Sequence, residues 1–329
     1  MDKDTISYSE MSTWALCRQK WNYSYGMRLS PKRRARAPAI GTCGHIALGA
    51  HLQGEDWEKA VDEWLVSYIS ETDLFDEEIE ESLEIGDLIK SIIPRYLKHF
   101  NDQWTPVMVE DRFEIGLSGT ATRFMGYMDA VVKATDGKLW LLEHKFPKRF
   151  KSDNDIELNA QLGMYAHACH RLGFPVVGVI YDQLLARMPE IPKVNKNGSL
   201  SKAQTYTNWE TYLAMINSLG LDENDYTEMR AKLSGNDFFR RTYVYKTPAE
   251  LKIVGKNITR KVWDARRKKK HIYRSESPMN CGWCSYRELC MEEAKGRDVS
   301  DIIATDFEPK RSRRKEEGKD DTTNGQTGT

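Results

Sequence analysis

Apolar side chains recur along the chain with two different spacings, and each spacing predicts one kind of element. A spacing of three or four residues predicts helices, which are expected at 6–25, 40–51, 55–101, 157–172, 206–237 and 248–270. Alternating or short apolar blocks predict strands, which are expected at 107–117, 124–134, 139–145, 176–185 and 240–245. The dipeptide Asp136-Gly137 is typical of a hairpin turn and joins two of these strands.

The order of these elements decides the fold class. Helices come first, three strands follow, and then a helix and a further strand. This order predicts an α/β domain with a central mixed sheet flanked by helices. We expect a single domain over 1–307, with a polar, exposed loop at 190–204. Residues 308–329 carry no large apolar side chain and are expected to form a disordered tail.

Composition and charge narrow the class of protein only slightly. Hydrophobic residues make up 40% and charged residues 30% of the chain, as in soluble enzymes. We expect no membrane span, because no run of eighteen apolar residues occurs, and a cytoplasmic protein, because the N-terminus lacks the pattern of a secretory signal. The formal net charge of zero gives no hint of a polyanionic partner, whereas dense basic runs at 32–36 and 266–270 favour phosphate contact.

Two carboxylates and a lysine stand at the ends of apolar strands. Glu143 and Lys145 are two residues apart in a strand, so their side chains share one face, and Asp129 on the preceding strand can lie beside Glu143. Hard cations such as Mg²⁺ bind carboxylate oxygens, and a lysine stabilises charge on a reacting phosphate. Charged groups in such apolar surroundings need a compensating partner. The pattern therefore favours a metal-dependent phosphodiesterase centre, with a surface salt bridge as the alternative.

The residues around these positions resemble those of the PD-(D/E)xK nuclease superfamily, in particular its RecB-like branch. The resemblance rests on Gly126-Tyr127-Met128-Asp129 followed by a strand that ends in Glu143-His144-Lys145. It implies a restriction-endonuclease-like core over about 40–185, and Glu143 in place of the commoner aspartate stays within the superfamily's pattern. It also implies further site residues, namely His45 in a Gly-x-x-x-His pattern that begins at Gly41, the acidic residue Glu110 or Glu114, and Gln161 and Tyr165 in a Gln-x-x-x-Tyr pattern.

The cysteines form a second pattern. Cys281, Cys284 and Cys290 alone are compatible with zinc, iron–sulfur or redox roles, and a tetrathiolate site needs a fourth thiol. Cys43 and Cys169 are expected in the core, which leaves Cys17. An N-terminal cysteine with a distant Cys-x2-Cys-x5-Cys resembles the iron–sulfur centre of RecB-like and CRISPR-associated exonucleases, although Arg18 stands where that family usually has proline. The resemblance implies a [4Fe-4S] cluster that joins the N- and C-terminal segments, with Zn²⁺ as the alternative.

The function implied by the resemblance is a Mg²⁺- or Mn²⁺-dependent DNA exonuclease that acts on DNA ends or single strands. In this hypothesis His45, Asp129 and Glu143 hold the ion, Lys145 contacts the scissile phosphate, and Gln161 and Tyr165 contact DNA or support the site. Compact versions occur in bacteriophages, which implies a role in DNA recombination, replication or repair. The expected partners are recombination or replication proteins, and the expected location is the host cytoplasm. Two alternatives are an inactive nuclease fold that binds DNA or serves assembly, and a structure-specific endonuclease.

Overall fold

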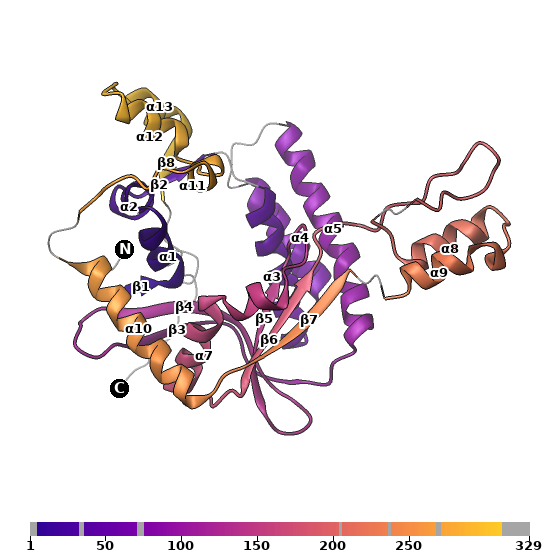
Figure 1. The fold of residues 1–329 in the computed structure, drawn as a ribbon, viewed down its shortest axis with the longest axis horizontal. Coiled ribbons are helices and arrows are strands. Elements are labelled where there is room, and N and C mark those ends of the chain that lie inside the picture. The colour runs from indigo at the N-terminus through magenta and orange to yellow at the C-terminus, as the bar shows by residue number, and fades with distance from the viewer. Residues whose placement is uncertain are drawn as a thin grey trace, which may run out of the picture. The chain divides into compact units, whose positions relative to one another are not determined.

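A computed structural model describes residues 5–32, 36–70, 76–203, 206–235, 238–267 and 271–310 (Figure 1). The chain divides into two compact units. The larger unit consists of Ala35–Phe113 and Gly126–Gly255, and the smaller of Met1–Arg34, Glu114–Met125 and Lys256–Thr329. The single domain expected over 1–307 stays a prediction, and each unit is described by itself below.

The larger unit is built on a mixed sheet, as predicted. Its strands are β3 (Thr105–Gly116), β4 (Arg123–Lys133), β5 (Leu139–Lys145), β6 (Gly178–Leu184) and β7 (Phe239–Tyr245), of which β3 and β4 begin or end in the smaller unit. The order is β4-β5-β6-β7, and β3 pairs with β4. Strands β5 and β6 are parallel, whereas β4 with β5 and β6 with β7 are antiparallel. The predicted α/β class with a mixed sheet is therefore confirmed.

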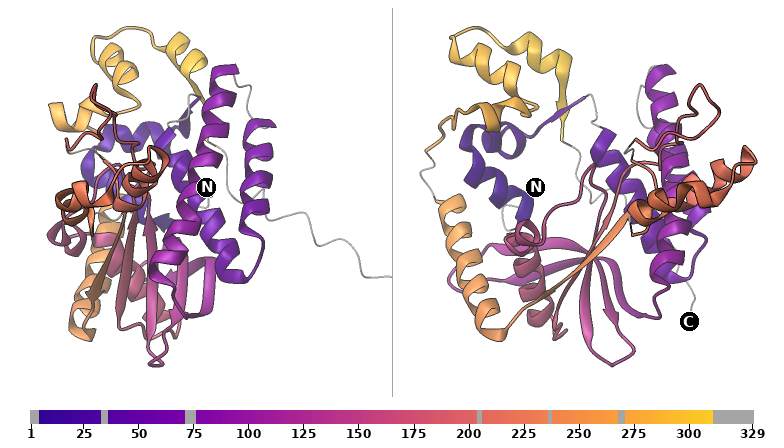
Figure 2. Two further views of the ribbon diagram at one scale, coloured as in Figure 1. Left: turned by 90° about the vertical axis from the view of Figure 1, so that its right-hand side faces the viewer. Right: turned by 45° about the vertical axis from the view of Figure 1, so that its right-hand side comes forward.

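Helices cover both faces of this sheet. Figures 1 and 2 show α3 (Arg36–Gln53), α4 (Trp57–Ser70) and α5 (Asp76–Phe100) together on one face, and α7 (Ala160–Arg171) on the other. The short α6 (Asp153–Glu157) and α7 form the crossover that parallel β5 and β6 require. The predicted helix 55–101 is thus two helices, α4 and α5.

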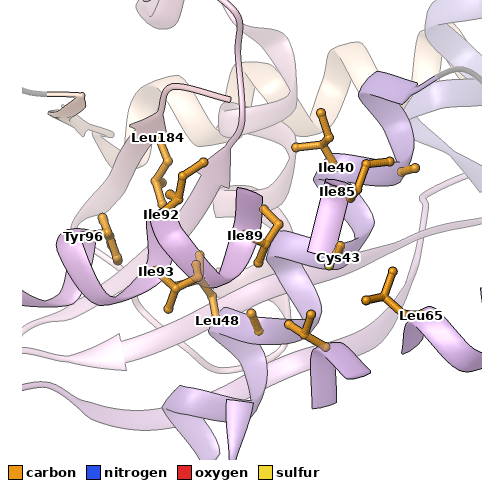
Figure 3. Packing of buried hydrophobic residues seen from close by; sticks show 13 residues of the cluster. Ile40, Cys43, Leu48, Leu65, Ile85, Ile89, Ile92, Ile93, Tyr96 and Leu184 are labelled. Carbon is orange, nitrogen blue, oxygen red and sulfur yellow. The ribbon is translucent and has the colours of Figure 1, made fainter. Parts of the chain in front are cut away.

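The helices α3, α4 and α5 pack through the apolar cluster shown in Figure 3. Helix α5 contributes isoleucines at three- and four-residue spacing, because only that spacing keeps them on one face. Gly86 allows α5 to approach α4 closely, since a Cβ there would lie 2.4 Å from Leu65. The cluster also contains Leu184 of β6, which fixes this helical layer against the sheet.

A helical insertion lies between β6 and β7. It contains α8 (Trp209–Ser218), a 3-10 turn (Glu223–Tyr226) and α9 (Thr227–Leu233), which lie together beyond the sheet in Figures 1 and 2. Its own core includes Leu200, Tyr212 and Tyr226. The Leu200 amide donates to the Tyr226 hydroxyl (2.9 Å), so the loop predicted at 190–204 is anchored to this core near its end.

The smaller unit joins the beginning and the end of the described chain. It begins with β1 (Thr5–Ser7), which pairs in parallel with residues 123–125 of β4. The N-terminal part continues with α1 (Tyr8–Leu16), α2 (Arg18–Trp21), a π-helical turn (Asn22–Gly26) and β2 (Leu29–Pro31). The C-terminal part consists of α10 (Pro248–Arg266, shared with the larger unit), α11 (Pro278–Gly282), α12 (Arg287–Ala294), α13 (Ser300–Asp306) and β8 (Phe307–Pro309).

Strand β8 pairs with β2, and Tyr23, Tyr286 and Phe307 stack between the two segments. The predicted tail 308–329 therefore begins inside a strand, and its residues from 311 onward lie outside the described ones. None of the described helices combines the length and apolarity that a membrane crossing would require.

Candidate metal centre

Three elements of the larger unit bring potential ligands together. His45 comes from α3, Glu110 from β3 and Asp129 from β4, and one ligand atom of each lies within 4.8 Å of the others. His45 Nδ1 is 3.4 Å from Asp129 Oδ2 and 3.6 Å from Glu110 Oε1, and this nitrogen forms no hydrogen bond with a described residue. An imidazole with two carboxylates suits a divalent cation such as Mn²⁺ or Mg²⁺.

Glu143 and Lys145 form a buried ion pair on β5. The carboxylate of Glu143 is 1% exposed, and its Oε1 contacts the Lys145 ammonium and accepts a hydrogen bond from Gln161 (3.1 Å). Its other oxygen, Oε2, is buried and has no hydrogen-bond partner among the described residues. A buried acceptor of this kind needs a partner, and a divalent cation would supply one. Glu143 therefore fits a metal centre, although it lies outside the tight group of His45, Glu110 and Asp129.

Burial and charge set the protonation of these groups. Burial raises the pKa of Asp129, and burial together with the charge of Asp129 raises the pKa of Glu143. Burial opposes charge on His45 and Lys145, but the neighbouring carboxylates outweigh it and raise the pKa of both. The carboxylates are thus costly to ionise without a cation, whereas Lys145 stays protonated at neutral pH.

Asp129 is oriented by the β5 backbone. The amide of His144 donates to Asp129 Oδ2 (2.7 Å). The ring of His144 is 3% exposed, with Nε2 3.3 Å from the Tyr96 hydroxyl of α5. Tyr96 donates to Asp182 (2.6 Å), and Asp182 accepts from Arg241. This buried network was not predicted, although an aspartate within the apolar run 176–185 is a signal that could have revealed it.

Two glycines of α3 position the site, and neither was predicted to do so. A Cβ on Gly44 would lie 2.1 Å from the ring of Phe146, and that ring stands edge-on to His45. A Cβ on Gly49 would lie 2.9 Å from Glu110 Cγ. By contrast, a Cβ on Gly41, the glycine of the predicted Gly-x-x-x-His pattern, would meet nothing within 4 Å.

Glu110 itself has a strained backbone. Its φ is 49°, a left-handed conformation that costs a non-glycine residue on the order of 1–3 kcal/mol. The conformation turns the Glu110 carboxylate toward His45, and Gly49 leaves room for its stem. The predicted alternative Glu114 instead pairs with Arg123 (3.2 Å) in the smaller unit and is absent from the described ligand group.

The Gly49→Ala variant tests this close approach. We expect the affinity for Mn²⁺ to fall about 10- to 100-fold, because the new methyl group displaces the Glu110 carboxylate from the candidate ligand group. Thermal stability should not fall, since alanine favours a helix by about 1 kcal/mol over glycine. The measurement is the dissociation constant for Mn²⁺ by isothermal titration calorimetry. Gly41→Ala on the same helix is the control, and equal affinities of the two variants for Mn²⁺ would contradict the role of Gly49.

Gln161 and Tyr165 lie one turn apart near the start of α7. Asn159 caps this helix by accepting from the Gln161 backbone amide (3.1 Å), and the side chain of Gln161 donates to Glu143. Tyr165 is buried, and its hydroxyl lies 2.6 Å from the position of a Cβ on Gly126, so only glycine fits on β4 there. Both residues thus contact the strands that carry the site, and contact with DNA stays a prediction.

All six cysteines are free thiols. Burial raises the pKa of Cys43 and of Cys169 to about 12, in accord with inert core positions. Cys17, Cys281, Cys284 and Cys290 are half-buried in the smaller unit. Burial raises the pKa of Cys284, and Cys17 and Cys281 are near enough to add to this effect. Among the described residues these sulfurs form no group at single-ion spacing, so a cluster or a zinc ion stays a prediction.

Comparison with known proteins identifies the class. The family model of the PD-(D/E)XK nuclease superfamily matches residues 5–291. The chain therefore belongs to this superfamily, and the predicted membership is confirmed at this level. No curated protein matches the chain.

Two solved structures match most of the chain but share little of its sequence. The protein SSO0001 is 13% identical with a TM-score of 0.36, and 88% of this chain and 87% of that one are covered. A Eubacterium rectale protein described as a candidate exonuclease is 10% identical with a TM-score of 0.40, over 85% of this chain and 93% of that one. Similarity at this level carries no conclusion about activity.

Proposed function

We propose that the protein is a Mg²⁺- or Mn²⁺-dependent DNA exonuclease. The observation that carries the proposal is the convergence of His45, Glu110 and Asp129 beside the buried Glu143–Lys145 pair, in a chain of the PD-(D/E)XK nuclease superfamily. In this proposal His45, Asp129 and Glu143 hold the ion, with Glu110 as a further ligand. The bound ion would offset phosphate charge and acidify an attacking water.

The protein groups have distinct tasks in this proposal. Lys145 is protonated, because its carboxylate neighbours raise its pKa, so it donates hydrogen bonds to the scissile phosphate and does not act as a base. Gln161 holds one oxygen of Glu143 and leaves the other free for the ion. The amide of His144 fixes the direction of the Asp129 carboxylate.

DNA degradation with and without a metal ion tests the activity. We expect linear single-stranded DNA to be degraded in Mn²⁺ and to stay intact in excess EDTA, because the carboxylates need the ion to act on phosphate. Wild-type protein without activity in Mn²⁺ would contradict the nuclease proposal and favour a DNA-binding or assembly role. Covalently closed circular single-stranded DNA separates the remaining alternatives, since an exonuclease leaves it intact and an endonuclease cuts it.

The resemblance to RecB-like exonucleases supports a [4Fe-4S] cluster on Cys17, Cys281, Cys284 and Cys290, with Zn²⁺ as the alternative. We expect anaerobically purified protein to be brown and to absorb near 400 nm, and Cys284→Ser to lose this absorption while Cys169→Ser keeps it. A colourless, zinc-loaded wild type would contradict the cluster. The same resemblance supports a bacteriophage enzyme of DNA recombination, replication or repair that works in the host cytoplasm.

A further inference from the structure

The pairing of β5, β6 and β7 shows which residues of β6 and β7 lie on the same face of the sheet as Lys145. Lys145 on β5 pairs with Gln183 on β6, and Gln183 pairs with Arg240 on β7. Paired residues project from the same face of a sheet, and neighbouring strands lie about 4.8 Å apart. The Arg240 backbone is therefore about 10 Å from that of Lys145, and both side chains project from one face.

The segment that follows Lys145 is fastened over this face. Gln183 is fully buried, and its side-chain amide accepts from the Lys151 amide (2.7 Å) and donates to the Lys151 carbonyl (3.4 Å). Pro147 accepts from the Ala186 amide (3.0 Å). The Arg240 guanidinium lies 4.6 Å from the centre of the Phe150 ring. The segment 147–151 is thus held at one end by Ala186, which follows β6, and at the other by Gln183 of β6, and its Phe150 ring lies against Arg240 of β7.

Five cationic side chains gather in this region. We call them the cationic strip: Lys148, Arg149, Lys151, Arg187 and Arg240. Within the described part of the chain none of them has an ion pair, and all but the half-buried Arg187 are exposed. Arg187 follows the Ala186 anchor and stacks on the half-exposed Tyr206 at 4.1 Å. The nearby carboxylates of Asp153 and Asp155 accept hydrogen bonds from Thr242 and Ser152.

The basic runs at 32–36 and 266–270 differ from the cationic strip, because several of their described residues contact other groups of the protein. Arg36 pairs with Glu84 (2.7 Å), and Arg266 pairs with Glu10 (2.6 Å). Lys32 donates to the carbonyl of Ala304 (2.7 Å). Arg36, Arg266 and Lys32 therefore have partners inside their own units, and the exposed Arg267 is the described member of those runs for which no partner is found among the described residues.

We propose that the cationic strip binds the phosphodiester backbone of a single nucleic acid strand and holds it beside the metal centre. Exposed cations combined with arginine–aromatic stacks suit a single strand, whose backbone they follow without reading sequence. The proposal rests on the proposed function, because the bound strand is the substrate whose scissile phosphate reaches Lys145. It adds a binding surface to the group that performs the reaction.

Binding without cleavage tests the strip. The quadruple variant changes Lys148, Arg149, Lys151 and Arg240 to glutamine, and the control variant makes the same change of charge at exposed Lys133, Lys196, Lys232 and Lys252 of the larger unit. Fluorescence anisotropy of a labelled oligothymidylate is measured in EDTA over a series of KCl concentrations. We expect the strip variant to bind at least about tenfold more weakly, with a salt slope lower by up to about 3, since each lost phosphate contact removes about 0.7. The control should change little.

Equal binding by the two variants would overturn the proposal. If the quadruple variant unfolds, the single variants Arg149→Gln and Arg240→Gln each lower the slope by about 0.7, and unchanged slopes overturn the proposal equally. A duplex of the same sequence is the second probe, and a loss confined to the duplex overturns the single-strand assignment. Since no measurement requires cleavage, an inactive wild type whose binding depends on the strip contradicts the proposed function alone. An active wild type with strip-independent binding contradicts the strip alone.

Discussion

Replacing Asp129 by asparagine is expected to lower the rate of DNA hydrolysis by about 10³-fold or more. Asp129 lies in the group with His45 and Glu110, and its negative charge is what a hard cation would bind. Asparagine has nearly the same size, and its oxygen can still accept from the His144 amide. The variant therefore removes the charge while it keeps the packing. The measurement is the initial rate on linear single-stranded DNA in Mn²⁺.

Metal-induced stabilisation separates this effect from damage to the fold. Burial raises the pKa of Asp129, so without metal the folded protein stabilises its ionised carboxylate less well than the unfolded chain does, and Asp129→Asn should not lower the melting temperature in EDTA. Mn²⁺ should raise the melting temperature of the wild type and of the control Asp87→Asn, an exposed position on α5, but not that of Asp129→Asn. A variant that hydrolyses DNA at more than about a tenth of the wild-type rate would exclude Asp129 from the site.

The sheet of the larger unit could be predicted because its strands are apolar and bounded by turns. The strand predicted at 139–145 matches β5, and the strand predicted at 240–245 differs from β7 by one residue. Strands β1, β2 and β8 were missed, because three residues are too few to show a period and their pairing depends on distant segments. The helix predicted at 6–25 is broken in the structure, where Cys17 is extended between α1 and α2.

The proximity of the candidate site residues was predictable where a motif fixes their order along the chain. His45, Asp129 and Glu143 are brought to one region of the larger unit, as the pattern implies. The contacts of Gly44 and Gly49 were not predictable, because they depend on how closely α3 approaches Phe146 and Glu110.

The sequence also gives an incomplete picture of which basic residues are free to bind a ligand. Dense basic runs attract notice in a sequence, but their density does not show whether acidic partners lie nearby in space. Arg36 has such a partner, whereas Arg149 and Arg240, which are distant in sequence, have none among the described residues. Only the strand register and the stack on Phe150 reveal that Arg240 belongs beside the segment of Arg149.

Replacing Arg241 by methionine is expected to lower the free energy of unfolding by about 3–5 kcal/mol. The guanidinium donates two hydrogen bonds to Asp182 (2.7 and 2.6 Å) and two to Asp102 (2.8 Å each), and its centre lies 3.8 Å from the Phe100 ring centroid. The side chain of Arg241 is 8% exposed and that of Asp182 only 1%. Methionine fills the space but leaves the Asp182 carboxylate without its counter-charge, which is the costly way to break a buried pair.

The measurement is the free energy of unfolding in urea for Arg241→Met, with Arg240→Met as the control. Arg240 is the adjacent residue, but it is exposed, and among the described residues its guanidinium has the Phe150 ring as its one recorded partner, so its loss should cost at most about 1 kcal/mol. Burial already raises the pKa of Asp182, and without Arg241 this pKa rises further above its unfolded value. The folded variant then holds a proton that the unfolded chain releases, so the stability difference from the wild type should widen as the pH rises from about 5 to 8. A loss below about 1 kcal/mol, or a difference that does not change with pH, would show that Asp182 does not depend on Arg241.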